Sequence, residues 1–220
     1  MENIRKNIVK YHPKEQKLNA ITHYIGAGLA LLGMIVLIVL ADSVIDYVAF
    51  IIYGICLIAM FLNSAIYHST SNIKLNYIMR AFDHCSIFLA IGGTYTPVLL
   101  IATTSWVRLI SIIFIWLACL IGIVLKIISF VTGKVKKFNR IFLAVYIILG
   151  WLSLILIPLV YSNTGLTTVM LLAIGGVFYS VGAIFYSKKS IKYNHAIWHL
   201  FILAASITQY FAVVYLAVKY

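Results

Sequence analysis

Two histidines near the end of the sequence, His195 and His199, have the spacing that most clearly indicates chemistry. Side chains four residues apart share one face of an α-helix and are separated by about 6 Å of rise, so both imidazoles can reach one metal ion. Such pairs also occur by chance, so a metal site needs another ligand. We predict His68, because Ser64 stands four residues before it and extends a polar stripe on its helix face. Three histidines around zinc leave one tetrahedral position for water or substrate, as in catalytic sites.

Three further ionisable residues are expected to surround these ligands. Asp83 either ligates the metal or holds its bound water, and we favour the second role, because a carboxylate beside zinc-bound water can act as a general base. His23 and His84 are expected to lie around the site without ligating it, or to form hydrogen bonds between helices. The chemistry therefore depends on elements that bring distant parts of the chain to one place.

The composition determines what those elements are. Of the 220 residues, 64% are hydrophobic and only 10% are charged, which is too apolar for a water-soluble globule of this size. The formal net charge is +12, but the basic residues lie in short runs between apolar stretches and not along one face, so a nucleic-acid partner is not expected. The sequence predicts a polytopic membrane protein whose basic residues contact anionic lipid headgroups.

Apolar runs of roughly 20 residues, the length that crosses about 30 Å of hydrocarbon, occur seven times along the chain. We expect helices, because a backbone in lipid must satisfy its own hydrogen bonds and no alternating strand pattern is present. The predicted fold is an all-α integral membrane protein, a seven-transmembrane helix bundle. The predicted spans cover residues 19–41, 46–68, 82–101, 107–128, 138–160, 166–187 and 194–218.

The distribution of Lys and Arg predicts the orientation of the bundle. Most of them precede the first span or lie in alternate connections, whereas Arg108 and Lys219 lie on the opposite side and Lys126 lies near an inner helix end. By the positive-inside rule the N-terminus is expected in the cytoplasm and the C-terminus outside. The residues on the predicted inner side are Arg5, Lys6, Lys10, Lys14, Lys17, Lys74, Arg80, Lys134, Lys136, Lys137, Arg140, Lys188, Lys189 and Lys192.

With this topology the ionisable residues fall in one layer near the inner leaflet. His68 ends the second span, Asp83 and His84 begin the third, and the paired histidines begin the seventh, while the outer halves of all the spans lack histidine. Charged or polar groups at membrane depth are costly, so their convergence favours a functional site. Arg80 is expected to pair with Asp83 or to face lipid headgroups.

The expected domain organisation has two parts. Residues 1–18 form a basic cytoplasmic N-terminal segment, which either lies flat at the membrane interface or is a mobile tail. Residues 19–220 form the seven-helix transmembrane domain, with external connections too short for an extracellular domain.

Three blocks of residues resemble the hemolysin III family, the bacterial branch of the progestin and adiponectin receptor (PAQR) family. The first runs from Glu15 through Asn19 and Thr22 to His23. The second comprises Ser64 and His68, then Arg80, Asp83 and His84, then Thr94 to Pro97, and the third is His195-Ala-Ile-Trp-His199. The resemblance covers nearly the whole chain.

This resemblance implies a seven-helix bundle with a cytoplasmic N-terminus and a zinc ion held by His68, His195 and His199. It also implies that Asp83 lies by the zinc-bound water with Ser64 close to it. We expect His23, His84, Asn19 and Arg80 to surround the ligands. The wider family belongs to a proposed superfamily of membrane hydrolases that includes alkaline ceramidases. Bacterial members are instead commonly called hemolysins or channel-forming cytolysins.

Three functions remain open on the sequence. The first is a zinc-dependent hydrolase of a lipid amide or ester bond, in which Asp83 takes a proton and Ser64 helps to hold the oxyanion. The second is a pore-forming hemolysin or channel, although no helix carries a polar stripe over its full depth. The third is a membrane sensor or regulator in which zinc fixes one conformation without catalysis. Substrate and oligomeric state are not predicted.

Overall fold

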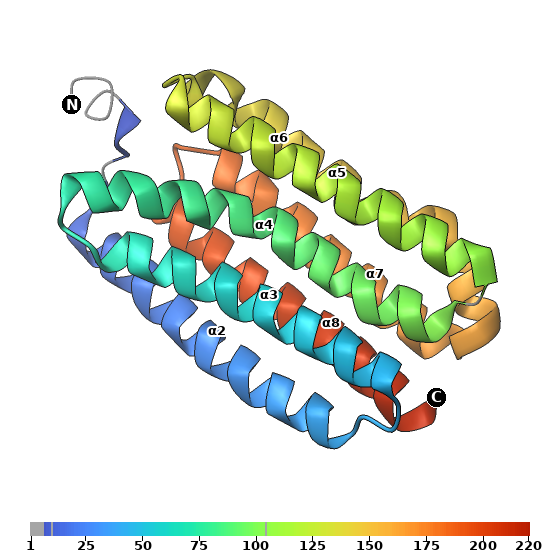
Figure 1. Ribbon diagram of the computed structural model, residues 1–220. Coiled ribbons are helices and arrows are strands. Elements are labelled where there is room, and N and C mark those ends of the chain that lie inside the picture. Colours follow the sequence, from blue (N-terminus) through green and yellow to red (C-terminus); the bar gives the residue numbers. More distant parts are fainter. Residues whose placement is uncertain (1–6, 10, 104) are drawn as a thin grey trace.

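Apolar runs joined by short polar connections form a bundle of long helices in the computed structural model, which describes residues 7–9, 11–103 and 105–220 (Figure 1). The all-α prediction is confirmed for this part of the chain. The basic residues Arg5, Lys6 and Lys10 lie outside it. The helices are α2 (Pro13–Val39), α3 (Val44–Ser69), α4 (Ile73–Ala102), α5 (Ser105–Val131), α6 (Val135–Trp151), the 3₁₀ helix η1 (Leu152–Leu156), α7 (Ile157–Ser187) and α8 (Asn194–Lys219).

Local side-chain contacts explain where the helices begin. Ser43 and Asp46 form a capping box at the start of α3: the Asp46 amide donates to Ser43 Oγ at 3.2 Å, and the Ser43 amide donates to an Asp46 carboxylate oxygen at 3.0 Å. Asn72 caps α4, since its side-chain oxygen accepts from the Leu75 amide at 3.0 Å. These polar turns stop one apolar helix and start the next.

Six helical segments in the described chain are long and apolar enough to cross a membrane. Five of them correspond to single predicted spans. The sixth, Val135–Ser187, is continuous through α6, η1 and α7 and covers two predicted spans in 53 residues. Its only non-helical backbone lies at Gly165, with φ 76° and ψ −175°, a conformation that glycine adopts readily.

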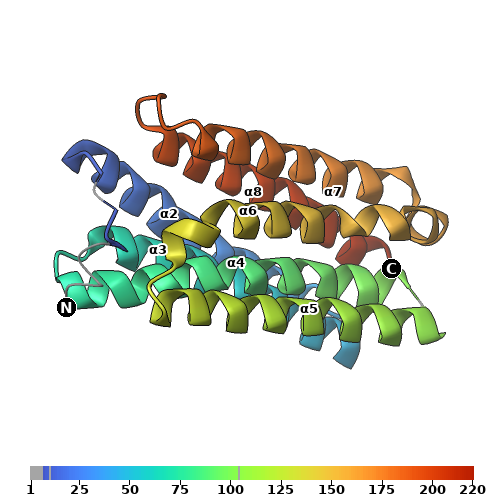
Figure 2. The same cartoon turned by 90° about the horizontal axis from the view of Figure 1, so that it is seen from above.

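The helices surround a shared core. In Figures 1 and 2, α3 lies between α2 and α4, and α8 lies alongside both α2 and α7. Large fully buried side chains on α3, including Phe50, Tyr53 and Phe61, pack in this core with Leu37 of α2 and Val213 of α8. This packing fixes the relative depth of α2, α3 and α8, the three helices that carry most of the predicted site.

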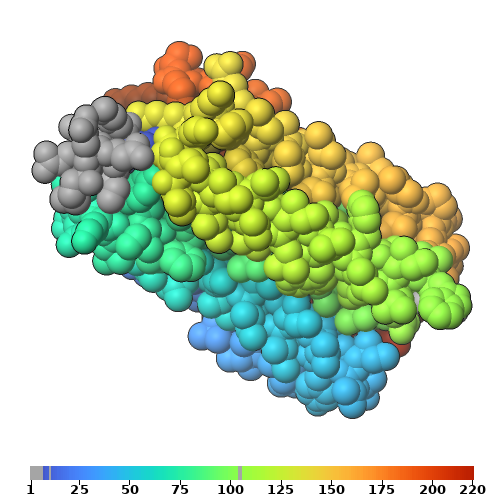
Figure 3. Space-filling model, turned by 45° about the horizontal axis from the view of Figure 1, so that its top comes forward, coloured from blue at the N-terminus to red at the C-terminus, as the bar shows by residue number. Residues whose placement is uncertain are grey.

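The outer surface of the bundle is strongly apolar. Exposed side chains include Leu32 of α2, Ile110 of α5, Ile148 of α6 and Val218 of α8, each more than 60% exposed. Figure 3 shows α5 and α6 side by side on one such face. A continuous apolar exterior is the opposite of a soluble protein's surface and suits contact with lipid.

Candidate metal centre

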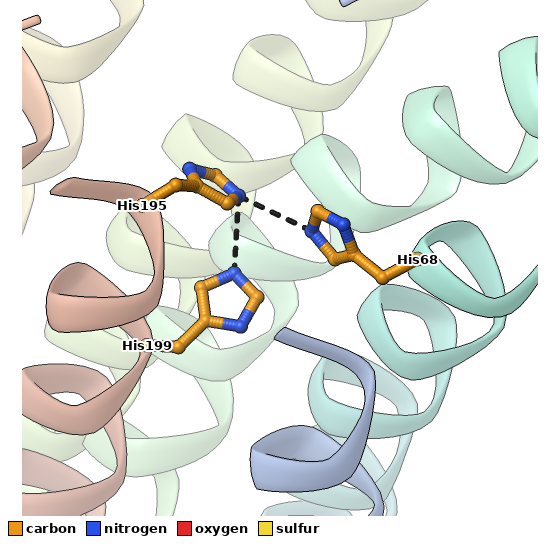
Figure 4. A group of neighbouring side chains, drawn as sticks. All are labelled: His68, His195 and His199. Atoms are coloured by element: carbon orange, nitrogen blue, oxygen red, sulfur yellow. Dashed lines mark hydrogen bonds between the residues drawn. The ribbon is translucent and has the colours of Figure 1, made fainter. Parts of the chain in front are cut away.

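Three of the predicted residues form a compact group at the end of the bundle where α2, α4 and α8 begin (Figure 4). His68 comes from the last turn of α3, and His195 and His199 come from the first turns of α8. The Nε2 atom of His195 lies 3.2 Å from that of His68 and 3.1 Å from that of His199. Two nitrogens bound to one tetrahedral zinc at about 2.0–2.1 Å are roughly 3.3 Å apart, so the spacing fits a shared ion.

The second ring nitrogen, Nδ1, shows how two of these three imidazole rings are oriented. His199 Nδ1 lies 3.3 Å from the backbone carbonyl oxygen of Asn19, and His68 Nδ1 lies 3.1 Å from Gln16 Oε1. Both partners are acceptors, so each Nδ1 carries the proton and each Nε2 presents its lone pair to the group. A proton on His195 Nε2 could form a hydrogen bond to only one of the two neighbouring Nε2 atoms at a time. A metal ion could bind all three nitrogens at once.

The first turns of α2 hold this arrangement in place. Glu15 is buried, and its Oε1 accepts from the backbone amide of His195 at 3.2 Å. It thereby caps α8, whose own N-cap residue, Tyr193, makes no side-chain capping bond. Together with Gln16 and the carbonyl of Asn19, Glu15 gives each predicted ligand one contact with α2.

Sequence reasoning missed the role of Gln16. The available signal was its position three residues before Asn19, which places both on one face of α2. Glu15 belonged to the block that resembles the family, but nothing in the sequence indicated that it would cap a helix 180 residues away.

Removing the Gln16 amide is expected to weaken metal binding without abolishing it. Gln16→Ala leaves His68 Nδ1 without its acceptor, and loss of such a contact costs about 10- to 100-fold in metal affinity. Titration of purified protein against a competing zinc chelator measures the change. Lys17→Ala, at the exposed neighbouring position, is the control. Equal affinities for the two variants would contradict this role of Gln16.

Asp83 and Ser64 lie beside the histidines in a small cavity of about 40 Å³. Among the described residues, the side chains close enough together to hold one ion are His68, His195 and His199, and Asp83 is not one of them. Ser64 Oγ is buried, and its side chain lies close enough to Asp83 to act on that carboxyl group. These positions agree with residues beside the metal, although their chemical roles stay predictions.

His23 and His84 line the same cavity from opposite helices. The His23 ring stacks on that of His199, with centroids 3.7 Å apart and an interplanar angle of 18°. The backbone carbonyl of His84 accepts from the Tyr146 hydroxyl at 2.9 Å. The structure places both histidines around the three-nitrogen group and outside it.

Two buried basic side chains, Arg80 of α4 and Lys126 of α5, lie near Asp83. The Arg80 guanidinium donates to the backbone carbonyl of Asn7, so this side chain points into the protein and not toward headgroups. Lys126 Nζ lies 4.2 Å from the ring centroid of Phe142. Both basic side chains are close enough to act electrostatically on the carboxyl group of Asp83, which is itself buried away from water.

A larger cavity of about 130 Å³ adjoins the site on the side facing the middle of the bundle. It is lined mostly by apolar side chains of α4, α6, α7 and α8. The two cavities share wall residues, including Met60, Ile87, Leu143 and Trp198. The larger, mostly apolar cavity is therefore directly adjacent to the small cavity beside the histidines.

The fold and the site together define a class, the multi-pass membrane proteins with a buried three-histidine group that could hold a metal ion. The family model described as Haemolysin-III related matches residues 11–210. The chain belongs to this hemolysin III family.

Named relatives agree with this assignment. The chain is 37% identical to the hemolysin-3 homolog of Bacillus subtilis (strain 168), in an alignment covering 94% of this chain and 96% of the relative. It is 38% identical to hemolysin-3 of Bacillus cereus, covering 92% and 91%. It is also 27% identical to the human monocyte to macrophage differentiation factor, covering 93% and 86%, a relative within the PAQR family.

Proposed function

We propose that this protein is a zinc-dependent membrane hydrolase that cleaves an amide or ester bond of a lipid. The observation that carries the proposal is the convergence of the Nε2 atoms of His68, His195 and His199 on one point. Three neutral imidazoles suit zinc and leave an exchangeable position. Zinc bound there would supply Lewis acidity and a water of lowered pKa.

The neighbouring side chains have the properties that hydrolysis requires. Asp83 shares a cavity with two of the proposed ligands, so its carboxylate is placed to accept a proton from a nucleophilic water and return it to the leaving group. Ser64 Oγ is buried beside Asp83, and in this proposal it donates a hydrogen bond to the oxygen that gains negative charge.

The position of the site supports a lipid substrate. The histidines lie in the end turns of helices long enough to span the bilayer, which corresponds to the depth of the bonds between lipid headgroups and acyl chains. The adjoining 130 Å³ apolar cavity offers space for hydrocarbon beside the reacting groups. Membrane lipid is therefore the proposed substrate class.

We also propose seven membrane passes with the N-terminus in the cytoplasm. A continuous 53-residue helix would extend about 80 Å, more than twice the hydrocarbon thickness. Reversal near Gly165, where the helical backbone is interrupted, divides Val135–Ser187 into two passes of suitable length. The basic connections then lie on the cytoplasmic side with the histidine site, where they contact anionic lipid headgroups.

The test of the proposed function combines metal analysis with a hydrolysis screen. Protein purified without added chelator is expected to contain about one zinc per chain. In detergent or nanodiscs it is expected to cleave one member of a panel of acyl amides and esters, to lose this activity on chelation and to regain it with zinc. Absence of stoichiometric zinc would contradict the metal site, and zinc without turnover across the panel would favour a sensor or regulator stabilised by zinc.

The bacterial relatives are named hemolysin-3 and a hemolysin-3 homolog, and a second candidate function is therefore a hemolysin that acts by forming a pore. Release of dye from liposomes distinguishes it from the hydrolase. Release that persists when His68 is replaced by alanine would favour a pore independent of the metal site.

A further inference from the structure

His195 differs from the other two proposed ligands in how its ring is held. Its Nδ1 is buried and has no hydrogen-bond partner in the described chain, whereas the Nδ1 atoms of His68 and His199 each face an oxygen of α2. A contact at this second nitrogen normally fixes the orientation of a metal-bound imidazole. Another interaction must therefore orient His195.

The ring of Tyr11 provides that interaction. It stacks on the His195 ring, with centroids 4.7 Å apart and an interplanar angle of 29°, and meets the His68 ring edge-on at 5.5 Å. Tyr186 contacts the His195 ring as well, at 5.5 Å and 50°. Tyr11 makes both of these histidine contacts with its aromatic ring.

The described residues that precede α2, residues 7–9 and 11–12, contact the histidine end of the bundle. Asn7 lies at one end of this segment: its side-chain amide donates to the carbonyl of Gly133, between α5 and α6, at 3.1 Å, and its own carbonyl accepts from Arg80 of α4. At the other end His12 caps α2 and contacts the Tyr193 ring at 6.3 Å. The segment is thus attached on both sides of the histidine group.

We propose that Tyr11 is a positioning residue for His195 and that the segment carrying it slows exchange of the bound metal. The inference rests on the proposed metal site and adds a control element to it. With Tyr11 stacked, His195 keeps its Nε2 aimed at the ion. When the segment detaches, His195 loses its stacking contact with Tyr11, and the ion is released more readily.

The experiment measures metal release from the full chain. Zinc-loaded wild type, Tyr11→Ala, Tyr11→Phe and Tyr161→Ala are mixed with excess EDTA, and zinc remaining on the protein is followed over time. Tyr161 is an exposed tyrosine of α7 and serves as the matched control. We expect release from Tyr11→Ala to be about 3- to 10-fold faster than from wild type, the range that an aromatic pair of ordinary strength contributes.

Two further readouts separate positioning from a general loss of structure. Tyr11→Phe keeps the ring and is expected to release zinc at the wild-type rate. With cobalt in place of zinc, the visible spectrum of Tyr11→Ala is expected to differ from that of wild type, while the unfolding midpoint of the metal-free protein matches that of Tyr161→Ala.

The possible failures are distinguishable. Wild-type protein that binds no zinc or cobalt would overturn the proposed metal site. Wild type that binds zinc, with Tyr11→Ala releasing it at the wild-type rate, would overturn the role of Tyr11 alone. Fast release from Tyr11→Phe would show that the hydroxyl matters and would overturn the stacking account.

Discussion

Replacing His199 with alanine is expected to eliminate stoichiometric zinc from the purified protein. Structural zinc sites bind with about 10–16 kcal/mol in total, so one of four ligands accounts for roughly 3–4 kcal/mol, or 10²- to 10³-fold in affinity. His199 Nε2 lies 3.1 Å from that of His195, and its Nδ1 faces the Asn19 carbonyl, so the alanine variant lacks an oriented ligand nitrogen at this position. Elemental analysis of protein in detergent gives the zinc content directly.

The matched control for this experiment is His84→Ala. His84 lines the cavity beside the site but lies outside the three-nitrogen group, so this variant is expected to retain zinc. Equal loss from both variants would indicate that disruption of the fold, and not removal of a ligand, releases the metal. Full retention in His199→Ala would remove this residue from the ligand set.

Replacing Asp83 with asparagine is expected to lower hydrolysis by about 10²- to 10⁴-fold, the usual contribution of general acid–base catalysis. The asparagine is nearly isosteric but cannot accept the proton. Because Asp83 lies outside the group close enough to share one ion, zinc content should stay near one per chain. The measurement pairs initial rates on the substrate found in the screen with metal analysis of the same sample.

Asp42→Asn provides the same chemical change at an exposed position between α2 and α3, and we expect it to leave hydrolysis unchanged. Loss of zinc from Asp83→Asn would show that the carboxylate is a ligand. Wild-type hydrolysis with zinc retained would show that another group accepts the proton.

Several features of the site followed from local sequence because they depend on helix periodicity alone. The spacing of His195 and His199 puts both on one helix face wherever that helix packs. The scarcity of ionisable residues in the apolar runs also made those that remain informative. His68 was chosen for the same reasons, and the structure brings it to 3.2 Å from His195.

Other features depended on contacts between distant segments. The sequence left the N-terminal residues either flat on the membrane or mobile, whereas Asn7 and Tyr11 pack against the histidine end of the bundle. Arg80 was expected to pair with Asp83 or to face headgroups; it acts electrostatically on Asp83, and it also donates to a backbone carbonyl 73 residues earlier in the chain. Neither contact has a periodic signature, because each joins segments with no fixed spacing.

By itself the sequence determined the all-α membrane fold, the positions of most helix ends and the set of histidines available for a metal. Hydropathy and polar caps act over a few residues, so they can be interpreted without knowing how the helices pack. Only the tertiary structure decided which ring nitrogens converge, that one face of α2 contacts all three proposed ligands, and that Tyr11 covers His195. These features arise from side chains on separate helices, whose distances are fixed only when the shared core is packed.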